Sequence, residues 1–131
     1  MTEQASGSIV TLSASISGSP VPWMAALTAT CGAIEFMSRS LAAEFAPAGV
    51  RVNCVRGDAM PDTRTIPLTS AGMAAIAGVP ADVWATQLPT PPLGRPVRAL
   101  DTAQTVAFLL SDAASATSAQ VINVASRAMA G

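Results

Sequence analysis

The chain has 131 residues, of which 50% are hydrophobic and 11% are charged, and its formal net charge is −1. This length is enough for one domain with a single core. All basic residues are arginines spread singly along the chain, so no cluster can follow a phosphate backbone, and nucleic-acid binding is not expected. No apolar run approaches the ~20 residues of a membrane span, and the first residues lack the regions of a secretion signal.

The low share of charged residues is unusual, because small soluble domains usually carry about a quarter. It indicates apolar surface that another chain covers, although an alanine-rich composition would also inflate the apolar count. The two cysteines, Cys31 and Cys54, have neither CxxC spacing nor a disulfide framework. We therefore expect buried, reduced thiols in a cytoplasmic protein.

The first half of the chain is predicted to form a strand over 8–13, a long helix over 23–46 and a strand over 51–55. Pro47 cannot continue the helix, and Gly49 allows the turn that follows it. A connection of this length between two strands is typical of a parallel crossover.

One face of the long helix is expected to be buried, because apolar side chains recur at helical spacing along it. These side chains are Leu27, Cys31, Ile34, Leu41 and Phe45. Glu35 and Arg39 lie four residues apart and are expected to form an ion pair on the solvated face.

The second half is predicted to add short helices over 70–78 and 80–88, a helix over 102–112 capped by Asp101, and a strand over 120–124. The predicted fold class is therefore α/β. We expect a partial Rossmann-like three-layer fold with a short parallel sheet of about three strands and one long crossover helix. The whole chain, residues 1–131, is expected to form one domain.

Three residue types that carry much of catalysis are missing, because the sequence contains no His, Lys or Tyr. These side chains supply most general-base, Schiff-base and phenol chemistry at neutral pH. The weak catalytic candidates are Asp58 and Asp62, which follow a strand at the edge where open α/β sheets hold ligands. They suit an acid–base pair or a divalent cation, whereas the structural interpretation is a helix cap plus a solvated turn in which Arg56 neutralises Asp58.

Several segments resemble the short-chain dehydrogenase/reductase family. They are GSIVTLSAS at 7–15, SRSLAAEFAPAGVRVNCV at 38–55, PLGRP at 92–96, AFLLSDAAS at 107–115 and AQVINV at 119–124. They follow the family's order and match only its back half, which holds the fifth to seventh strands. The resemblance therefore implies a truncated domain without the N-terminal dinucleotide-binding half, and the chain has no Gly-rich turn of the kind that binds a dinucleotide.

The resemblance also shows where the family's chemistry is lost. The family uses a Ser after the fifth strand, and a Tyr and a Lys four residues apart on the next helix. Those positions are Ala14, Leu27 and Cys31 here, and the family's Pro-Gly pair after the sixth strand is Gly57-Asp58. Leucine cannot transfer a proton, so ordinary hydride transfer is not expected. We expect no cofactor and no metal.

The resemblance further implies which surfaces remain. In the family, the fifth strand lies beside a fourth strand that this chain does not match, so an open strand edge is expected along 8–13. The family's subunit interfaces involve the long helix, and the last strand with its preceding helix, and both are retained. We expect a non-catalytic partner or oligomerisation subunit that associates with itself or with a full-length member of the family.

Two other interpretations stay open at this point. One is a cofactor-independent lyase, cyclase or dehydratase that uses Asp58 or Asp62 beside an apolar pocket over 64–90. The other is a fragment of a longer protein whose front half lies upstream.

Overall fold

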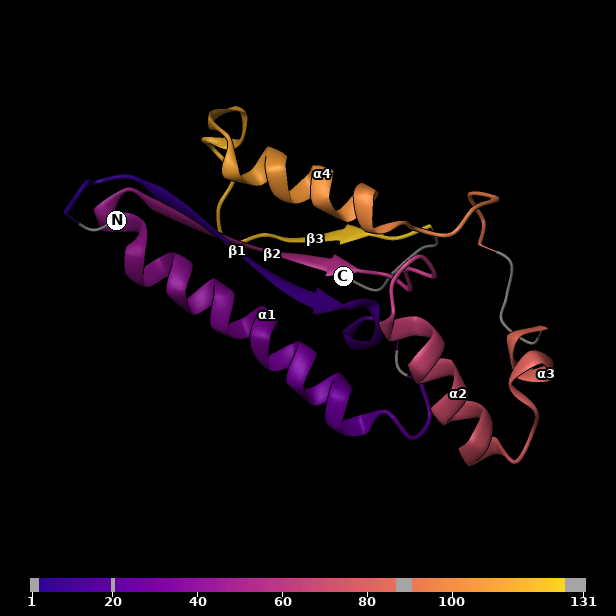
Figure 1. Cartoon of the computed structure of the whole chain (residues 1–131). Coiled ribbons are helices and arrows are strands. Elements are labelled where there is room, and N and C mark those ends of the chain that lie inside the picture. The colour runs from indigo at the N-terminus through magenta and orange to yellow at the C-terminus, as the bar shows by residue number, and fades with distance from the viewer. Residues whose placement is uncertain (1–2, 20, 87–90, 127–131) are drawn as a thin grey trace.

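The computed structural model describes residues 3–19, 21–86 and 91–126. A sheet lies between two helices, with α1 on one face and α4 on the other, while α2 and α3 lie beyond the carboxyl ends of the strands (Figure 1). The strands are β1 (Gly7–Ala14), β2 (Val50–Gly57) and β3 (Val121–Val124). The helices are α1 (Ala25–Phe45), α2 (Thr65–Ala77), α3 (Ala81–Thr86) and α4 (Ala99–Leu110).

The sheet has the order β1-β2-β3, and both strand pairs are parallel. The register runs from Gly7 opposite Val50 to Ala14 opposite Gly57, and Cys54 lies opposite Val121. The predicted α/β fold with three parallel strands is therefore confirmed for the described residues. No helix within them is both long enough and apolar enough to traverse a lipid bilayer.

The central strand, β2, forms the middle of the core. Val52, Cys54 and Val55 are fully buried, as a strand with a helix on each face requires. On the α4 side, Val55 packs with Leu109 and Ala114. Four partly buried side chains complete this cluster: Val10, Val106, Ile122 and Val124.

Polar side chains of β2 tie it to the end of α4 and to the loop that leads into β3. Arg51 donates hydrogen bonds to the carbonyl oxygens of Leu109, Ser111 and Thr117. Its guanidinium therefore provides donors for carbonyl groups at the C-terminal end of α4, which have no partner within the helix. The fully buried Asn53 donates to Thr117 O at 2.8 Å and accepts from Gln120 N at 3.1 Å. Both ends of its amide are therefore satisfied.

The buried face of α1 differs from the prediction. Its buried residues are Cys31, Glu35, Ser38 and Ala42, whereas Leu27 is 45% exposed. Ser38 is satisfied by Thr11 Oγ1 at 2.6 Å and by the Ile34 carbonyl at 2.6 Å. Polar side chains can occupy the buried face because each has a hydrogen-bond partner, which an apolar-periodicity rule does not consider.

Two helix starts also differ from the prediction. α2 begins at Thr65 rather than at residue 70, and Pro67 lies in its first turn, where its missing N–H needs no helical partner. α4 begins at Ala99, so Asp101 occupies the third helical position rather than the cap. The carboxylate of Asp101 still caps the helix by accepting a hydrogen bond from Arg98 N at 2.9 Å. The expected helix over 80–88 is present as α3, and its last two residues lie outside the described part of the chain.

Candidate functional site

The carboxyl ends of β1 and β2 hold a buried polar cluster centred on Glu35 and Arg56. Arg56 Nη2 lies 2.6 Å from Glu35 Oε2, and Arg56 Nε donates to Glu35 Oε1 at 2.9 Å. Ser13 and Ser17 also donate to Glu35 Oε1, and Arg56 Nη1 donates to Asn123 Oδ1 at 3.2 Å. The cluster therefore joins β1, α1, β2 and β3 at the edge where open α/β sheets hold ligands.

The charge state of Glu35 is fixed by this environment. Burial alone would raise the pKa of its carboxyl, but hydrogen bonds from Arg56, Ser13 and Ser17, together with the charge of Arg56, outweigh it and lower the pKa to about 2. The pKa of Arg56 is raised, chiefly by its hydrogen bond to Glu35. Glu35 is therefore ionised at neutral pH and suits a structural counter-ion better than a proton donor.

This arrangement corrects the expected pair of Glu35 with Arg39. Arg39 is exposed, and its guanidinium lies 5.3 Å from the centre of the Phe36 ring on the outer face of α1. Glu35 instead points to the sheet and pairs with Arg56, 21 positions away in the sequence. The preference of helices for pairs four residues apart is weak, and burial of Glu35 against the sheet decides the partner.

Ala14, Leu27 and Cys31, which the resemblance places at the family's Ser, Tyr and Lys positions, lie at the end of β1 and in the first half of α1. Ala14 is the last residue of β1 and is partly buried, and Leu27 is exposed in the first turn of α1. Cys31 and Cys54 are free, buried thiols, as predicted. The hydroxyl group of Ser15, next to Ala14, donates a hydrogen bond to Asp58 Oδ1 at 2.8 Å.

The two loop carboxylates have different partners. Asp58 accepts from Ser15, whereas Asp62 accepts from the backbone N–H of Ala99 with both oxygens, at 3.2 and 3.1 Å. Asp62 therefore caps α4, which agrees with the structural interpretation, although the helix it caps is α4 rather than the next one along the chain. An acid–base role for Asp58 and Asp62 stays a prediction. The described residues contain no group of three His, Cys, Asp or Glu side chains that could hold a metal ion.

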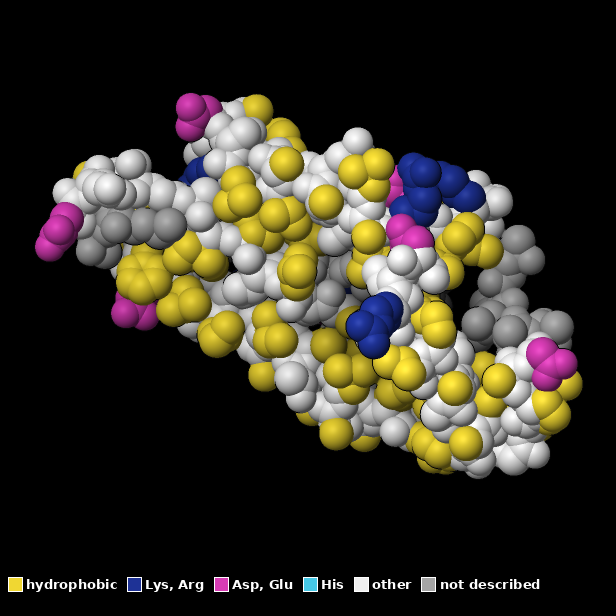
Figure 2. All heavy atoms as spheres, in the orientation of Figure 1, with side chains coloured by type: hydrophobic (Ala, Val, Ile, Leu, Met, Phe, Trp, Pro, Cys, Tyr) yellow, Lys and Arg dark blue, Asp and Glu magenta, His cyan; other side chains and the backbone are white. Residues whose placement is uncertain are grey.

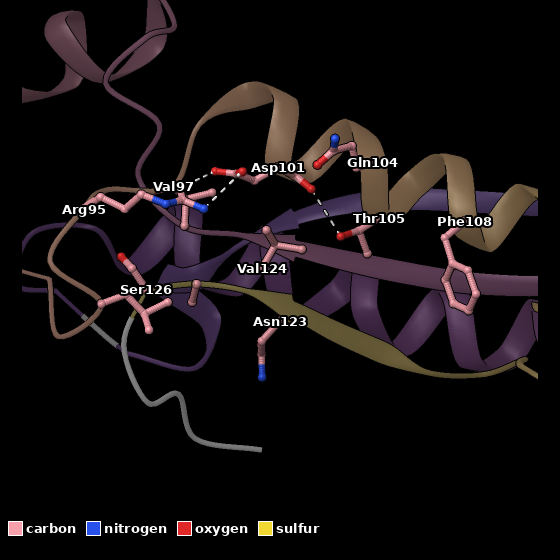
Figure 3. A pocket seen from close by; sticks show the side chains of 11 residues that line it. Arg95, Val97, Asp101, Gln104, Thr105, Phe108, Asn123, Val124 and Ser126 are labelled. Atoms are coloured by element: carbon pink, nitrogen blue, oxygen red, sulfur yellow. Dashed lines mark hydrogen bonds and ion pairs between the residues drawn. The ribbon is translucent and has the colours of Figure 1, made fainter.

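A hollow of about 500 Å³ lies on the other side of the sheet, between α4 and β3 (Figure 3). Arg95 and Asp101 form an ion pair at one end of it, with an Nη1–Oδ2 distance of 2.7 Å. Gln104, Thr105 and Phe108 from α4 line it opposite Val124 and Ser126. No sequence motif predicts this hollow, because it is formed by side chains from three separate segments.

The N-terminus of α4 and the turn after β1 do not suit the diphosphate of a nicotinamide dinucleotide, which this kind of fold often binds. Its diphosphate needs free backbone N–H groups at a helix N-terminus, usually beside glycines. The N-terminus of α4 is closed by the carboxylates of Asp62 and Asp101, which would repel a diphosphate. β1 leads into a short 3-10 turn at Ser15–Ser17 rather than into a Gly-rich turn, so no cradle forms there.

A parallel sheet with helices on both faces defines this chain as part of a Rossmann-like α/β protein. The family whose sequence model is described as enoyl-(acyl carrier protein) reductase matches residues 1–126. The chain belongs to this family, within the short-chain dehydrogenases/reductases.

Individual relatives agree with this assignment. The chain is 35% identical over 115 residues to a cis-4-hydroxycyclohexanecarboxylate dehydrogenase of Sinomonas cyclohexanicum, covering 88% of this chain and 42% of the relative. It is 37% identical over 117 residues to 2-(S)-hydroxypropyl-CoM dehydrogenase 3 of Xanthobacter autotrophicus, covering 87% of this chain and 43% of the relative. The chain therefore spans less than half the length of these relatives.

Solved structures show the same relation. An actinorhodin polyketide ketoreductase with NADPH superposes with a TM-score of 0.83 at 26% identity, covering 96% of this chain and 48% of the ketoreductase. A putative gluconate 5-dehydrogenase from Beutenbergia cavernae superposes with a TM-score of 0.75 at 31% identity, covering 96% and 47% of the two chains. Nearly all of this chain thus has the arrangement of one part of a fold about twice as long.

Proposed function

We propose that this chain acts as a non-catalytic subunit of the short-chain dehydrogenase/reductase type that associates with a second copy of itself or with a full-length member of the family. The observation that carries the proposal is a second apolar face on α1, directed away from the sheet. The residues at the family's catalytic positions support the non-catalytic part, because Ala14 and Leu27 have no proton to transfer and the Cys31 thiol is buried.

The second apolar face of α1 has regular helical spacing. Its members are exposed small or apolar side chains: Ala29, Ala33, Phe36, Met37 and Ser40. Phe36 is 69% exposed and Met37 is 48% exposed. A helix that packs one face on a sheet and also carries small and apolar side chains on its opposite face is typical of one buried between two layers, and the described residues supply only one layer.

The surface of α4 adds further exposed apolar side chains. Leu100, Phe108 and Leu110 are all about half exposed, and Phe108 lines the hollow beside β3. Figure 2 shows hydrophobic side chains spread along the helices, with charged side chains few and scattered.

The amount of exposed surface supports association. The chain exposes 7773 Å², whereas a folded monomer of 13.2 kDa is expected to expose about 6,400 Å². The difference of roughly 1,400 Å² exceeds the ~800 Å² that each partner buries in a standard interface. One or two ordinary interfaces would therefore bring the exposed area into the usual range.

Size-exclusion chromatography with light scattering tests the proposal. We expect the purified chain to form a dimer or larger assembly, and the double variant Phe36→Gln, Met37→Gln to shift it towards the monomer. Leu68→Gln is the matched control, because Leu68 is 70% exposed on α2, away from this face. A well-folded monomer in dilute solution would contradict the proposal.

A further inference from the structure

The hollow between α4 and β3 has charged groups at one end and apolar side chains along its walls (Figure 3). Its volume of about 500 Å³ lies within the usual range of sites for small molecules, about 300–1,000 Å³. Val97 is buried and Val124 is partly buried, whereas Phe108 is about half exposed. The hollow therefore combines apolar walls with a small number of polar groups, which is the usual composition of a small-molecule site.

The segment that carries Arg95 is held in place at the charged end of the hollow. Leu93 N donates a hydrogen bond to Ser126 O at 3.2 Å, which fixes this segment against the end of β3. The guanidinium of Arg95 donates to both carboxylate oxygens of Asp101 on α4. The pKa of Asp101 is lowered to about 2, chiefly by its hydrogen bond from Arg95, so the pair is charged at neutral pH. The guanidinium is therefore oriented before any ligand arrives.

One edge of the Arg95 guanidinium remains available for a further contact. Nη1 donates to Pro96 O at 3.1 Å and to Asp101 Oδ2 at 2.7 Å, and Nη2 donates to Asp101 Oδ1 at 3.3 Å. Within the described part of the chain, the N–H of Nε and the second N–H of Nη2 have no acceptor. These two N–H groups are parallel, and this Nε–Nη2 edge matches the two oxygens of a carboxylate.

The charges around this edge favour a singly charged anion. Arg98 Nη2 lies 3.5 Å from Asp101 Oδ1, so Arg95 and Arg98 share one carboxylate, and two positive charges and one negative give +1. The carboxylate of Asp62 is held at Ala99 N and does not line the hollow. A diphosphate would need the N–H groups that Asp62 and Asp101 occupy, whereas a single carboxylate needs only the Nε–Nη2 edge of Arg95.

We propose that the hollow binds a small organic acid, in which one carboxylate is attached to an apolar ring or short chain. The carboxylate accepts two hydrogen bonds from the Nε–Nη2 edge of Arg95, and the apolar part packs against Phe108, Val97 and Val124. This site goes beyond the proposed function. It lies on the α4 side of the sheet, whereas the proposed association uses the outer face of α1 on the other side, so either proposal can fail alone.

Titration of the nitrogen-15-labelled full chain with benzoate, followed by two-dimensional NMR, tests the site. We expect saturable shifts of the amide signals of Val97, Thr105 and Val124, with a dissociation constant of about 1 mM or lower. Benzyl alcohol has the same ring without the carboxylate, and we expect it to bind about tenfold more weakly than benzoate. This comparison needs no substitution, so the proposal can be tested even if a variant does not fold.

Variants of Arg95 separate its hydrogen-bonding edge from its charge. Arg95→Gln is expected to weaken benzoate binding about tenfold, and Arg95→Lys by a smaller factor, because lysine keeps the charge without the bidentate geometry. Arg98→Gln is the matched control, since Arg98 has the same exposed fraction, 56%, and also contacts Asp101 but does not line the hollow. Its effect is expected to stay within about twofold. Phe108→Ser is expected to weaken the binding of benzoate and benzyl alcohol alike, because the ring of each packs on Phe108.

The proposal is wrong if benzoate causes no saturable shift of the amides around the hollow in the folded chain. It is also wrong if benzyl alcohol binds as tightly as benzoate, or if Arg95→Gln and Arg98→Gln weaken benzoate binding equally. None of these results depends on the oligomeric state of the chain, which tests the proposed function separately.

Discussion

Glu35 on α1 and Arg56 on β2 form a bidentate ion pair, and both side chains are almost completely buried. The Oε2–Nη2 distance is 2.6 Å, and the side chains are 7% and 6% exposed. A guanidinium and a carboxylate that meet through two parallel hydrogen bonds form one of the stronger polar contacts in proteins. The pair holds the crossover helix against the end of the central strand.

Replacement of Glu35 by glutamine is expected to lower the free energy of unfolding by about 3–5 kcal/mol. The substitution leaves the Arg56 charge buried without a counter-ion, and this loss exceeds the net value of the pair itself. Urea unfolding followed by circular dichroism measures the change.

The matched control is Arg95→Gln, which breaks an ion pair on the surface. Arg95 is 56% exposed, so its pair with Asp101 is expected to contribute far less to stability than the buried pair. The double variant Glu35→Leu, Arg56→Met is expected to recover part of the stability lost in Glu35→Gln, because it removes both charges but leaves the Ser13 hydroxyl without its acceptor. Equal, small losses in Glu35→Gln and Arg95→Gln would show that Glu35 and Arg56 are not held together in solution.

The pH dependence of stability provides an independent test. The pKa of Glu35 is about 2 in the folded chain and 4.5 for an unperturbed side chain. As the pH falls from about 4.5 to 2, the unfolded chain binds the proton first, so the stabilisation by Glu35 is present above pH 4.5 and is lost across this window. Glu35→Gln is therefore expected to show a shallower loss of stability over the same window. Parallel curves for the wild type and the variant would contradict the low pKa.

Much of the fold was predictable because it depends on local patterns. The apolar runs of β1 and β2, and the long stretch between them that Pro47 and Gly49 end, define the parallel crossover without any tertiary information. The bounds of these elements shifted by at most a few residues. α2 begins at Thr65 rather than at the predicted residue 70, because the first helical turn tolerates Pro67.

The polar contacts were not predictable from spacing in the same way. Sequence proximity favoured Arg39 as the partner of Glu35, whereas the actual partner Arg56 is 21 residues away. Asp62 caps a helix that begins 37 residues later, at Ala99. Such contacts depend on how the elements pack, and a buried charge accepts whichever partner the packing supplies. The strand position of Arg56, a charged residue at the end of an apolar run, was the available signal.

Gly49 is expected to be required at the turn between α1 and β2. Its φ angle is +66°, in the left-handed region, and an added Cβ would collide with the carbonyl oxygen of Ala5. Gly49→Ala should therefore lower the free energy of unfolding by about 1–3 kcal/mol. Gly72→Ala in α2 is the control, since nothing lies within 4 Å of its Cβ position, and it should be neutral or stabilising by up to about 1 kcal/mol. Stabilisation by Gly49→Ala would contradict this turn geometry.

Asp62 separates the structural and the catalytic interpretations of the loop carboxylates. As a cap, its task is to accept a hydrogen bond from Ala99 N, and an asparagine side chain can do the same. Asp62→Ala is therefore expected to lower the free energy of unfolding by about 1 kcal/mol, and Asp62→Asn to lower it by only about 0.3 kcal/mol. Glu44→Ala is the control, because Glu44 is exposed near the C-terminal end of α1, where a negative charge does not stabilise the helix. Thermal unfolding of Asp62→Ala, Asp62→Asn and Glu44→Ala shows the order of their stabilities. If Asp62→Ala and Glu44→Ala are equally stable, Asp62 does not cap α4, and its carboxylate is then available for the acid–base role.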